Sequence, residues 1–221
     1  MSGVPHVPSP AIATDEEPRD PRFASRGRAY VYVLPCRDED LLKVGFSRDP
    51  AARLRTLHRR FFEFFDLERG LLVATDHVRD ARRIERRFIE AFRACGAPAP
   101  PVVRSAAGGH TEWFRGVGAQ ATDLARTVCE EQGFTLLAPL RGWLRERLAE
   151  SAGSLYDWSA RMLDAIEFET HNVPPEQRAH AHERALRDVL DAHCALGLEP
   201  APLVPESVAC WHAAHSAWRG G

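Results

Sequence analysis

The chain has 221 residues, 44% of them apolar and 27% charged, and its formal net charge is −2. Such a composition is ordinary for a globular protein of one or two domains, and the small net charge excludes a basic field over the whole chain. The total hides an asymmetry. Residues 26–95 carry 16 Lys/Arg against 11 Asp/Glu (+5), whereas residues 130–221 carry 8 against 14 (−6). A polyanion is therefore expected to meet the first half of the chain.

Cysteine usage and apolar segments bear on the compartment. The five cysteines are an odd number without framework-like spacing, so we expect reduced thiols. Residues 1–20 hold no apolar signal-peptide region, and no apolar run approaches the roughly 20 residues that span a bilayer. We predict a cytoplasmic protein that has no membrane partner.

In chain order, residues 1–25 are rich in Pro and charge and are predicted to be a disordered tail. The β-branched and aromatic run at 30–34 predicts a strand, and the apolar run at 41–46 predicts its antiparallel hairpin partner. Asp49 followed by Pro50 is a strong helix start, which predicts a helix to about residue 60.

A third strand is predicted at 71–75, followed by a long helix to about residue 95 whose apolar residues recur every three to four positions. A Pro/Gly/Ala-rich loop fills 97–109, residues 111–114 re-enter the core, and a helix at 120–132 ends at Gly133. Further helices are expected at 140–149, 155–168 and 176–196, before a Pro-rich tail.

The fold class predicted is α+β: a small three-stranded antiparallel sheet flanked by helices, then an all-helical C-terminal region. The predicted divisions are a tail (1–25), the sheet domain (26–132), a helical appendage (133–199) and a Pro-rich tail (200–221). Two interpretations of 133–199 are open. It is either an acidic module for a protein partner or self-association, with its own small core, or an extension that packs back onto the sheet.

Several short motifs follow one another on these elements. Tyr30-Val31-Tyr32 lies in the first strand, Lys43-Val44-Gly45 in the second, Arg53 and Glu85 on the two helices, and Thr-Glu-Trp-Phe ends the series at 111–114. Over residues 29–116 this order resembles the GIY-YIG nuclease superfamily, in the T5orf172-like and Mug113-like branch whose second element reads Lys-Ile-Gly or Lys-Val-Gly. The resemblance implies a GIY-YIG-like domain.

The resemblance further implies hydrolysis of DNA phosphodiester bonds with one divalent metal, Mg²⁺ or Mn²⁺. Tyr32 would match the tyrosine that helps to activate the attacking water, Arg53 the catalytic arginine and Glu85 the metal-binding glutamate. These residue types suit the chemistry, because a forked guanidinium binds phosphate oxygens and a carboxylate is a hard metal ligand.

Further candidates surround these three residues. Lys43 stands where relatives often carry a tyrosine, and would contact phosphate or lower the pKa of Tyr32. His58 is a candidate polar helper in catalysis, with a surface histidine as the alternative. Glu112 and Tyr30 are candidates for supporting the catalytic residues, with a salt bridge or strand-end cap and simple packing as the respective alternatives.

Three more residues complete the candidate site: Gly45, Arg55 and Arg59, as substrate-binding positions. A glycine in a strand allows close approach of a neighbouring group. The alternative for the two arginines is a solvated helix face.

Each principal candidate also has a plain structural interpretation. Tyr32 could be a core residue with its hydroxyl at the rim, and Arg53 could lie on a solvated helix face. Glu85 could belong to an exposed ion-pair lattice with the arginines around it. The aromatic run at 61–65 could stack on bases, but buried core is the favoured interpretation.

Three functions therefore compete at this level. The first is a metal-dependent DNA endonuclease. The second is a catalytically weak nucleic-acid-binding or regulatory module on the same scaffold. The third is a protein-interaction module that works through the acidic helical half.

Overall fold

The structure is a computed structural model that describes residues 26–103 and 111–218. The tail predicted at 1–25 and part of the loop predicted at 97–109 lie outside the described residues.

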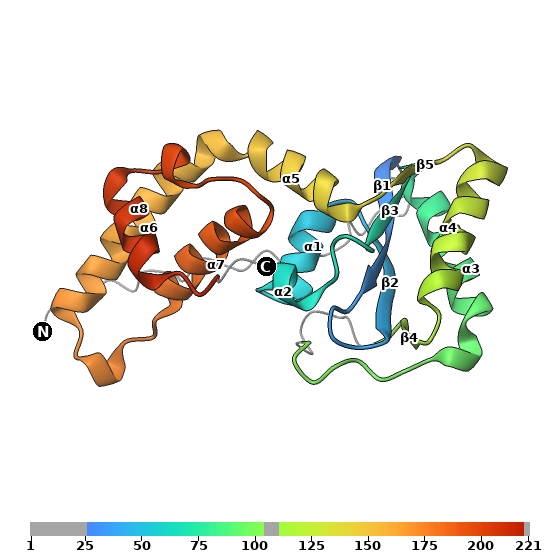
Figure 1. Cartoon of the computed structure of the whole chain (residues 1–221), viewed down its shortest axis with the longest axis horizontal. Coiled ribbons are helices and arrows are strands. Elements are labelled where there is room, and N and C mark those ends of the chain that lie inside the picture. Colours follow the sequence, from blue (N-terminus) through green and yellow to red (C-terminus); the bar gives the residue numbers. More distant parts are fainter. Residues whose placement is uncertain (1–25, 104–110, 219–221) are drawn as a thin grey trace, which may run out of the picture.

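The described residues form strands and helices in the order shown in Figure 1. The strands are β1 (Arg26–Pro35), β2 (Leu41–Ser47), β3 (Leu71–His77), β4 (Trp113–Arg115) and β5 (Thr135–Leu137). The α-helices are α1 (Pro50–Leu57), α2 (Phe61–Phe64), α3 (Val78–Ala91), α4 (Gly118–Gln132), α5 (Leu140–Glu150), α6 (Ala152–Asn172), α7 (Ala181–Ala195) and α8 (Glu206–His215). Short 3₁₀ turns are η1 (Arg93–Cys95), η3 (Pro175–Gln177) and η4 (Ala201–Leu203).

The five strands form one antiparallel sheet in the order β4-β2-β1-β3-β5. The predicted α+β class is confirmed, but the predicted number of three strands is wrong. The two strands that were missed, β4 and β5, are edge strands of three residues each. Segments this short carry no readable alternation of apolar and polar residues, which is why the sequence pattern hid them.

The start of α1 follows the local sequence. The Asp49 side chain accepts a hydrogen bond from the Ala52 backbone N–H at 3.0 Å, and Pro50 is the first helical residue. The helix ends at Leu57, earlier than predicted, because His58 takes an extended conformation. The turn lets α2 begin and places the aromatic run in the core, where Phe61 and Phe62 are buried.

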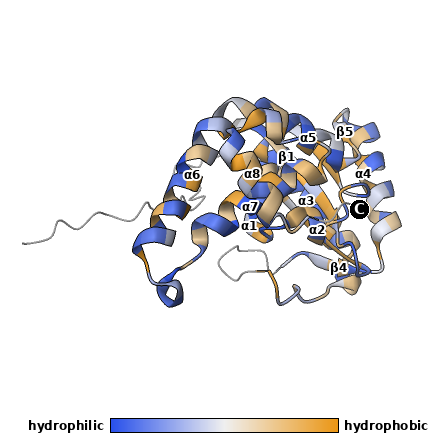
Figure 2. Ribbon diagram, turned by 60° about the vertical axis from the view of Figure 1, so that its left-hand side comes forward, coloured by the Kyte–Doolittle hydropathy of each residue, from blue (hydrophilic) through white to orange (hydrophobic). Residues whose placement is uncertain are grey.

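Alternation along the strands gives the sheet two faces. The Val31 face, with Val31, Val33 and Val44, is covered by α3 and α4. The Tyr32 face, with Tyr30 and Tyr32 among its residues, is covered by α1, α2 and α5. Figure 1 shows the helices on opposite sides of the sheet, and Figure 2 shows the apolar strands enclosed between helices that carry hydrophilic residues.

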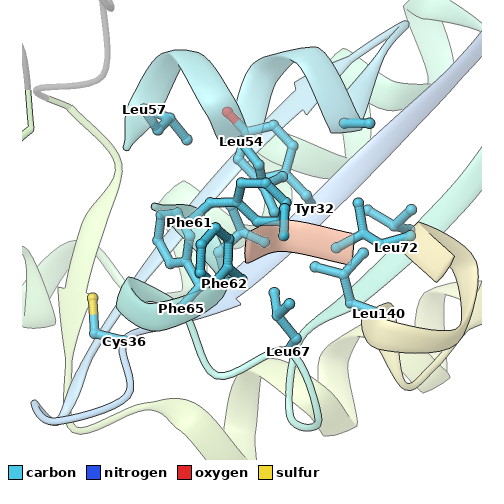
Figure 3. Close-up of a cluster of buried hydrophobic side chains, with 14 of the residues drawn as sticks. Tyr32, Cys36, Leu54, Leu57, Phe61, Phe62, Phe65, Leu67, Leu72 and Leu140 are labelled. Carbon is cyan, nitrogen blue, oxygen red and sulfur yellow. The ribbon is translucent and has the colours of Figure 1, made fainter. Parts of the chain in front are cut away.

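The C-terminal helices do two things. Leucines of α6 and α7 join Val208 of α8 in a separate small core. At the same time α5 inserts Leu140, Leu144 and Leu148 into the core of the Tyr32 face, and its Trp143 ring lies 5.5 Å from the Tyr30 ring. Figure 3 shows Leu140 reaching this cluster beside Leu72. The region therefore has a small core of its own and also extends the core of the Tyr32 face, whereas a role in binding a protein partner or in self-association stays a prediction.

The segment predicted as a Pro-rich tail contains η4 and the ten-residue helix α8, which packs on α6 and α7. Within residues 26–103 and 111–218, none of the helices is both long enough and apolar enough to cross a membrane.

Candidate active site

Gly45 and Tyr32 form the centre of the candidate site. They are paired across β1 and β2, and the Tyr32 ring is almost completely buried. A Cβ atom built on Gly45 would lie 2.3 Å from the Tyr32 hydroxyl oxygen and 2.5 Å from Cζ. Only a residue without a side chain leaves this space, so Gly45 lets the Tyr32 ring lie across its backbone.

Arg53 reaches the same tyrosine from α1. Its Nε donates a hydrogen bond of 3.4 Å to the Tyr32 hydroxyl oxygen, and the arginine is half-buried. The bond is long for this pair of atoms and therefore weak. Neither plain interpretation holds in full, because Tyr32 is a core residue that also binds Arg53, and Arg53 is not on a solvated face.

Lys43 is buried on the Tyr32 face, with 1% of its surface exposed. Its ammonium donates three hydrogen bonds of 2.8 Å, to the Val44 carbonyl, the Thr111 carbonyl and Glu112 Oε2. An ammonium has three hydrogens, and all of them are used. Lys43 thus links β2 to the segment before β4 through hydrogen bonds. To contact a phosphate, the ammonium would have to lose one of these three hydrogen bonds.

The pairing of β2 with β4 stops at Lys43. The Val44 N–H still donates to the Glu112 carbonyl at 3.0 Å. Alternate residues of a strand point their N–H groups to the same edge, so Phe46 presents its N–H there too. The Glu85 carboxylate, which comes from α3, accepts a hydrogen bond from this Phe46 N–H.

This contact gives Glu85 a partner outside α3. In α3, Arg83 pairs with Asp80, and Arg87 reaches across to Glu131 on α4. Glu85 binds the edge of β2, at the border between the Val31 face and the candidate site, and the positive charge of Arg82 in α3 also acts on it.

Glu112 lies close enough to Glu85 for its charge to act on it. Its backbone lies in the left-handed region at φ 58°, which is uncommon for a residue other than glycine. Its carboxylate accepts hydrogen bonds from Lys43 Nζ and from the Thr111 hydroxyl. Burial alone would raise the pKa of Glu112, but these two bonds and the charge of Lys43 outweigh burial and lower it.

The charges in the site act on one another. Burial and the negative charge of Glu112 raise the pKa of Glu85 above its ordinary value, although Lys43, Arg82 and the Phe46 N–H act against the shift. Burial also raises the pKa of Tyr32, and the charge and hydrogen bond of Arg53 only partly offset it. Tyr32 is therefore a protonated phenol in the free protein.

The donor set of the site suits some metals and not others. Among residues 26–103 and 111–218, no three His, Cys, Asp or Glu side chains gather as a metal cage, which does not fit a closed zinc site. Mg²⁺ is usually held by one or two carboxylates with water and substrate phosphate. Glu85, with its charge opposed by Glu112 nearby, fits such a ligand, because a cation would relieve the repulsion.

The remaining candidates lie elsewhere. His58 stacks on Phe64, with ring centroids 4.7 Å apart, and burial lowers its pKa. Arg59 forms a salt bridge with Asp188 of α7 at 2.8 Å, and Arg55 lies beside it in the wall of a cavity at the C-terminal helices. Tyr30 packs on Trp143.

The sequence reasoning missed three contributors. Thr111 binds both Lys43 and Glu112, the Phe46 backbone holds Glu85, and Arg82 lies over the Phe46 ring at 5.5 Å. The position of Arg82, one helical turn before Glu85, was the only signal for it in the sequence. Backbone groups leave no such signal, since any residue could supply them.

Comparison with known protein families gives one match. The model of the T5orf172 domain matches residues 29–129, which include Tyr32, Lys43, Arg53, Glu85 and Glu112. No curated protein and no solved structure gives a significant match to the chain. Residues 29–129 of this chain therefore match the T5orf172 domain, and this match is compatible with a nuclease-like or DNA-binding function.

Proposed function

We propose that the protein is a metal-dependent DNA endonuclease whose site is built by Tyr32, Arg53 and Glu85. The observation that carries this proposal is the meeting of these three side chains, from a strand and two helices, around the glycine at position 45. The Arg53–Tyr32 hydrogen bond and the electrostatic influence of Glu85 on Tyr32 tie the three groups together.

Each side chain has a task that suits its surroundings. Arg53, permanently charged and half-buried, would stabilise the negative charge that develops on the phosphate. Glu85 would hold Mg²⁺ or Mn²⁺, and the bound cation would supply a polarised phosphate and a more acidic water. Tyr32, whose hydroxyl oxygen already accepts from Arg53, would orient the attacking water through its own O–H.

Lys43 has a positioning role in this proposal. Its ammonium holds the Glu112 carboxylate in a salt bridge, and the negative charge of Glu112 in turn raises the pKa of Glu85. The lysine in place of a tyrosine is then compatible with activity, because it contributes through Glu112 and not through the phosphate.

The test incubates the full chain with supercoiled plasmid and with branched DNA, in Mg²⁺ or Mn²⁺. Arg53→Ala and Glu85→Gln are expected to lower the cleavage rate by about 100-fold or more. Glu90→Gln is the matched control, since Glu90 is an exposed carboxylate on the same helix. The proposal fails if the wild type cleaves none of these substrates, or if Glu85→Gln cleaves as fast as Glu90→Gln.

A second candidate is a nucleic-acid-binding or regulatory module that has little catalytic activity. Two observations favour it: burial keeps Tyr32 protonated, and Lys43 has no hydrogen left for a phosphate. If the protein is such a module, it should bind DNA, and Arg53→Ala should weaken this binding. Neither the wild type nor the variant should then cleave a DNA strand in the presence of Mg²⁺ or Mn²⁺. A protein partner or self-association through the C-terminal helices remains a prediction from the acidic composition of this region.

A further inference from the structure

A cavity of about 530 Å³ opens between the end of α1, α2 and the C-terminal helices α5–α7. This volume is within the usual range for pockets that hold small ligands. The cavity lies outside the cluster of Tyr32, Arg53 and Glu85, and none of the three lines it. Its walls come from both parts of the chain.

One buried polar atom in the cavity wall has no partner. His193 of α7 is 3% exposed, and its Nδ1 lies 2.8 Å from the Val189 carbonyl oxygen. A carbonyl can only accept, so Nδ1 carries the hydrogen. Burial and the charge of Arg55 lower the pKa of His193, which keeps the ring neutral and leaves Nε2 as an acceptor.

Within the described part of the chain, this Nε2 receives no hydrogen bond. A buried polar group without a partner is costly, commonly by about 1–3 kcal/mol, and calls for a donor. His193 is one of the residues that line the cavity, although Nε2 itself is covered in the free protein. A donor on a bound molecule would reach Nε2 once the side chains over it move aside.

The same wall carries an excess of positive charge. Among the described residues that line the cavity, Arg55, Arg59 and Arg184 supply three guanidinium groups and Asp188 is the one carboxylate, which leaves +2. Asp188 is already bound by Arg59 and Arg60. The positive charge of the cavity wall therefore favours an anionic ligand. A phosphate is well suited, because one guanidinium group can bind two phosphate oxygens at once.

The remaining wall is apolar and aromatic. Trp158 of α6 and Phe61 of α2 provide aromatic rings, and Leu148 and Leu155 provide aliphatic surface. Such a wall suits a flat ring of the ligand, while the arginines suit its charged end.

We propose that this cavity binds a nucleoside phosphate, with the phosphate on Arg55 and Arg184, the ring on the aromatic wall, and an N–H or O–H donated to His193 Nε2. The ligand is a free nucleotide or the terminal nucleotide of a single strand, which share this chemistry. The inference does not rest on nuclease activity, since binding needs neither metal nor cleavage.

The test is calorimetry on the full chain without metal, with AMP, GMP, CMP and TMP, a 5′-phosphorylated trinucleotide, and inorganic phosphate as separate probes. At least one nucleotide or the trinucleotide is expected to bind more tightly than inorganic phosphate. Arg55→Ala and Arg184→Ala should each weaken that binding by on the order of 10-fold. Arg145→Ala, an exposed arginine of α5 outside the cavity, is the matched control and should leave binding unchanged.

His193→Leu separates a ligand-binding role from a structural one. It removes the unpaired acceptor while keeping bulk, so the melting temperature should stay the same or rise, whereas ligand affinity should fall. The proposal is overturned if no nucleotide or trinucleotide binds at millimolar concentration, or if inorganic phosphate binds as well as they do. It is equally overturned if Arg55→Ala and His193→Leu bind like the wild type. Tighter binding of the trinucleotide would assign the cavity to a strand end, and tighter binding of a mononucleotide to a free ligand.

Discussion

The two faces of the sheet are built by neighbouring residues of the same strands, yet they differ in chemistry. The Val31 face meets α3 and α4 through an apolar cluster. The Tyr32 face carries a buried lysine, a tyrosine bound to an arginine, and a glycine whose missing side chain makes room for the tyrosine ring. The Val31 face can therefore be stable by apolar burial alone, whereas the Tyr32 face depends on specific polar pairs and on helices from the C-terminal region.

The largest expected effect comes from the link that holds those helices over the Tyr32 face. Asp191 of α7 is fully buried and accepts hydrogen bonds from Arg60, from His212 and from Ser216, at 2.8, 2.8 and 2.7 Å. Asp191→Ala removes the acceptor of these three hydrogen bonds and leaves the partly buried charge of Arg60 without this partner. We expect the free energy of unfolding, measured by urea denaturation, to fall by about 3–5 kcal/mol.

The matched control for that prediction is Asp164→Ala, which changes an exposed carboxylate of α6 and should stay within about 0.5 kcal/mol of wild type. If Asp191→Ala lowers the free energy of unfolding no more than the control does, the Arg60–Asp191 salt bridge does not help to hold α7 in place.

Loss of the three hydrogen bonds of the Lys43 ammonium should give the next largest effect on stability. Lys43→Met keeps the apolar stem and removes the ammonium, so two carbonyls and Glu112 lose a donor. We expect a loss of about 3 kcal/mol in unfolding free energy. In a double-mutant cycle, adding Glu112→Gln should cost less in the Lys43→Met background than in wild type. Additive losses would show that the pair is not coupled.

Gly45→Ala tests the steric basis of the site. The new methyl group would overlap the Tyr32 ring, which must then move. We expect about 1–3 kcal/mol of destabilisation and a fall of about 100-fold in any cleavage activity. Adding Tyr32→Leu should restore stability but not cleavage, whereas Gly142→Ala, at an open position in α5, should not destabilise.

The smallest expected effect is on the titration of Glu85. Because the charge of Glu112 raises the pKa of Glu85, Glu112→Gln should lower this pKa in an NMR titration without metal. A raised carboxyl pKa contributes stability below the ordinary value of 4.5, and this contribution is lost as pH rises through the folded pKa. Glu85→Gln should remove that loss. An unchanged Glu85 titration in Glu112→Gln would place the two carboxylates too far apart to interact.

Local signals in the sequence predicted much of the fold. The helix start at Asp49-Pro50, the stop at Gly133 and the stripe along α3 each depend on neighbouring residues, and all three are present in the structure. The three-residue edge strands were not predictable, since their pairing depends on distant partners. Motif order led to Tyr32, Arg53 and Glu85, which the structure brings together.

Other parts of the site escaped prediction for a physical reason. Lys43 was assigned by its position in a motif, but its actual contacts involve backbone carbonyls and a residue 69 positions away. The cavity wall combines Arg55 of α1 with His193 of α7, and no spacing in the sequence predicts that the two residues line the same cavity. Arg55 and Arg59 were singled out for their charge, while the direction in which they point depends on helices much later in the chain.

The insertion of α5 into the Tyr32 face has a consequence for synthesis on the ribosome. The last strand of the sheet ends at Leu137, but the core of this face also needs Leu148 of α5 and Leu196 beyond α7. A nascent chain grows at about 5–20 residues per second, so the face stays open to water for several seconds after the strands have emerged. During this interval the nascent sheet is exposed to aggregation and to chaperones, and a fragment cut at the family boundary would stay in that state permanently.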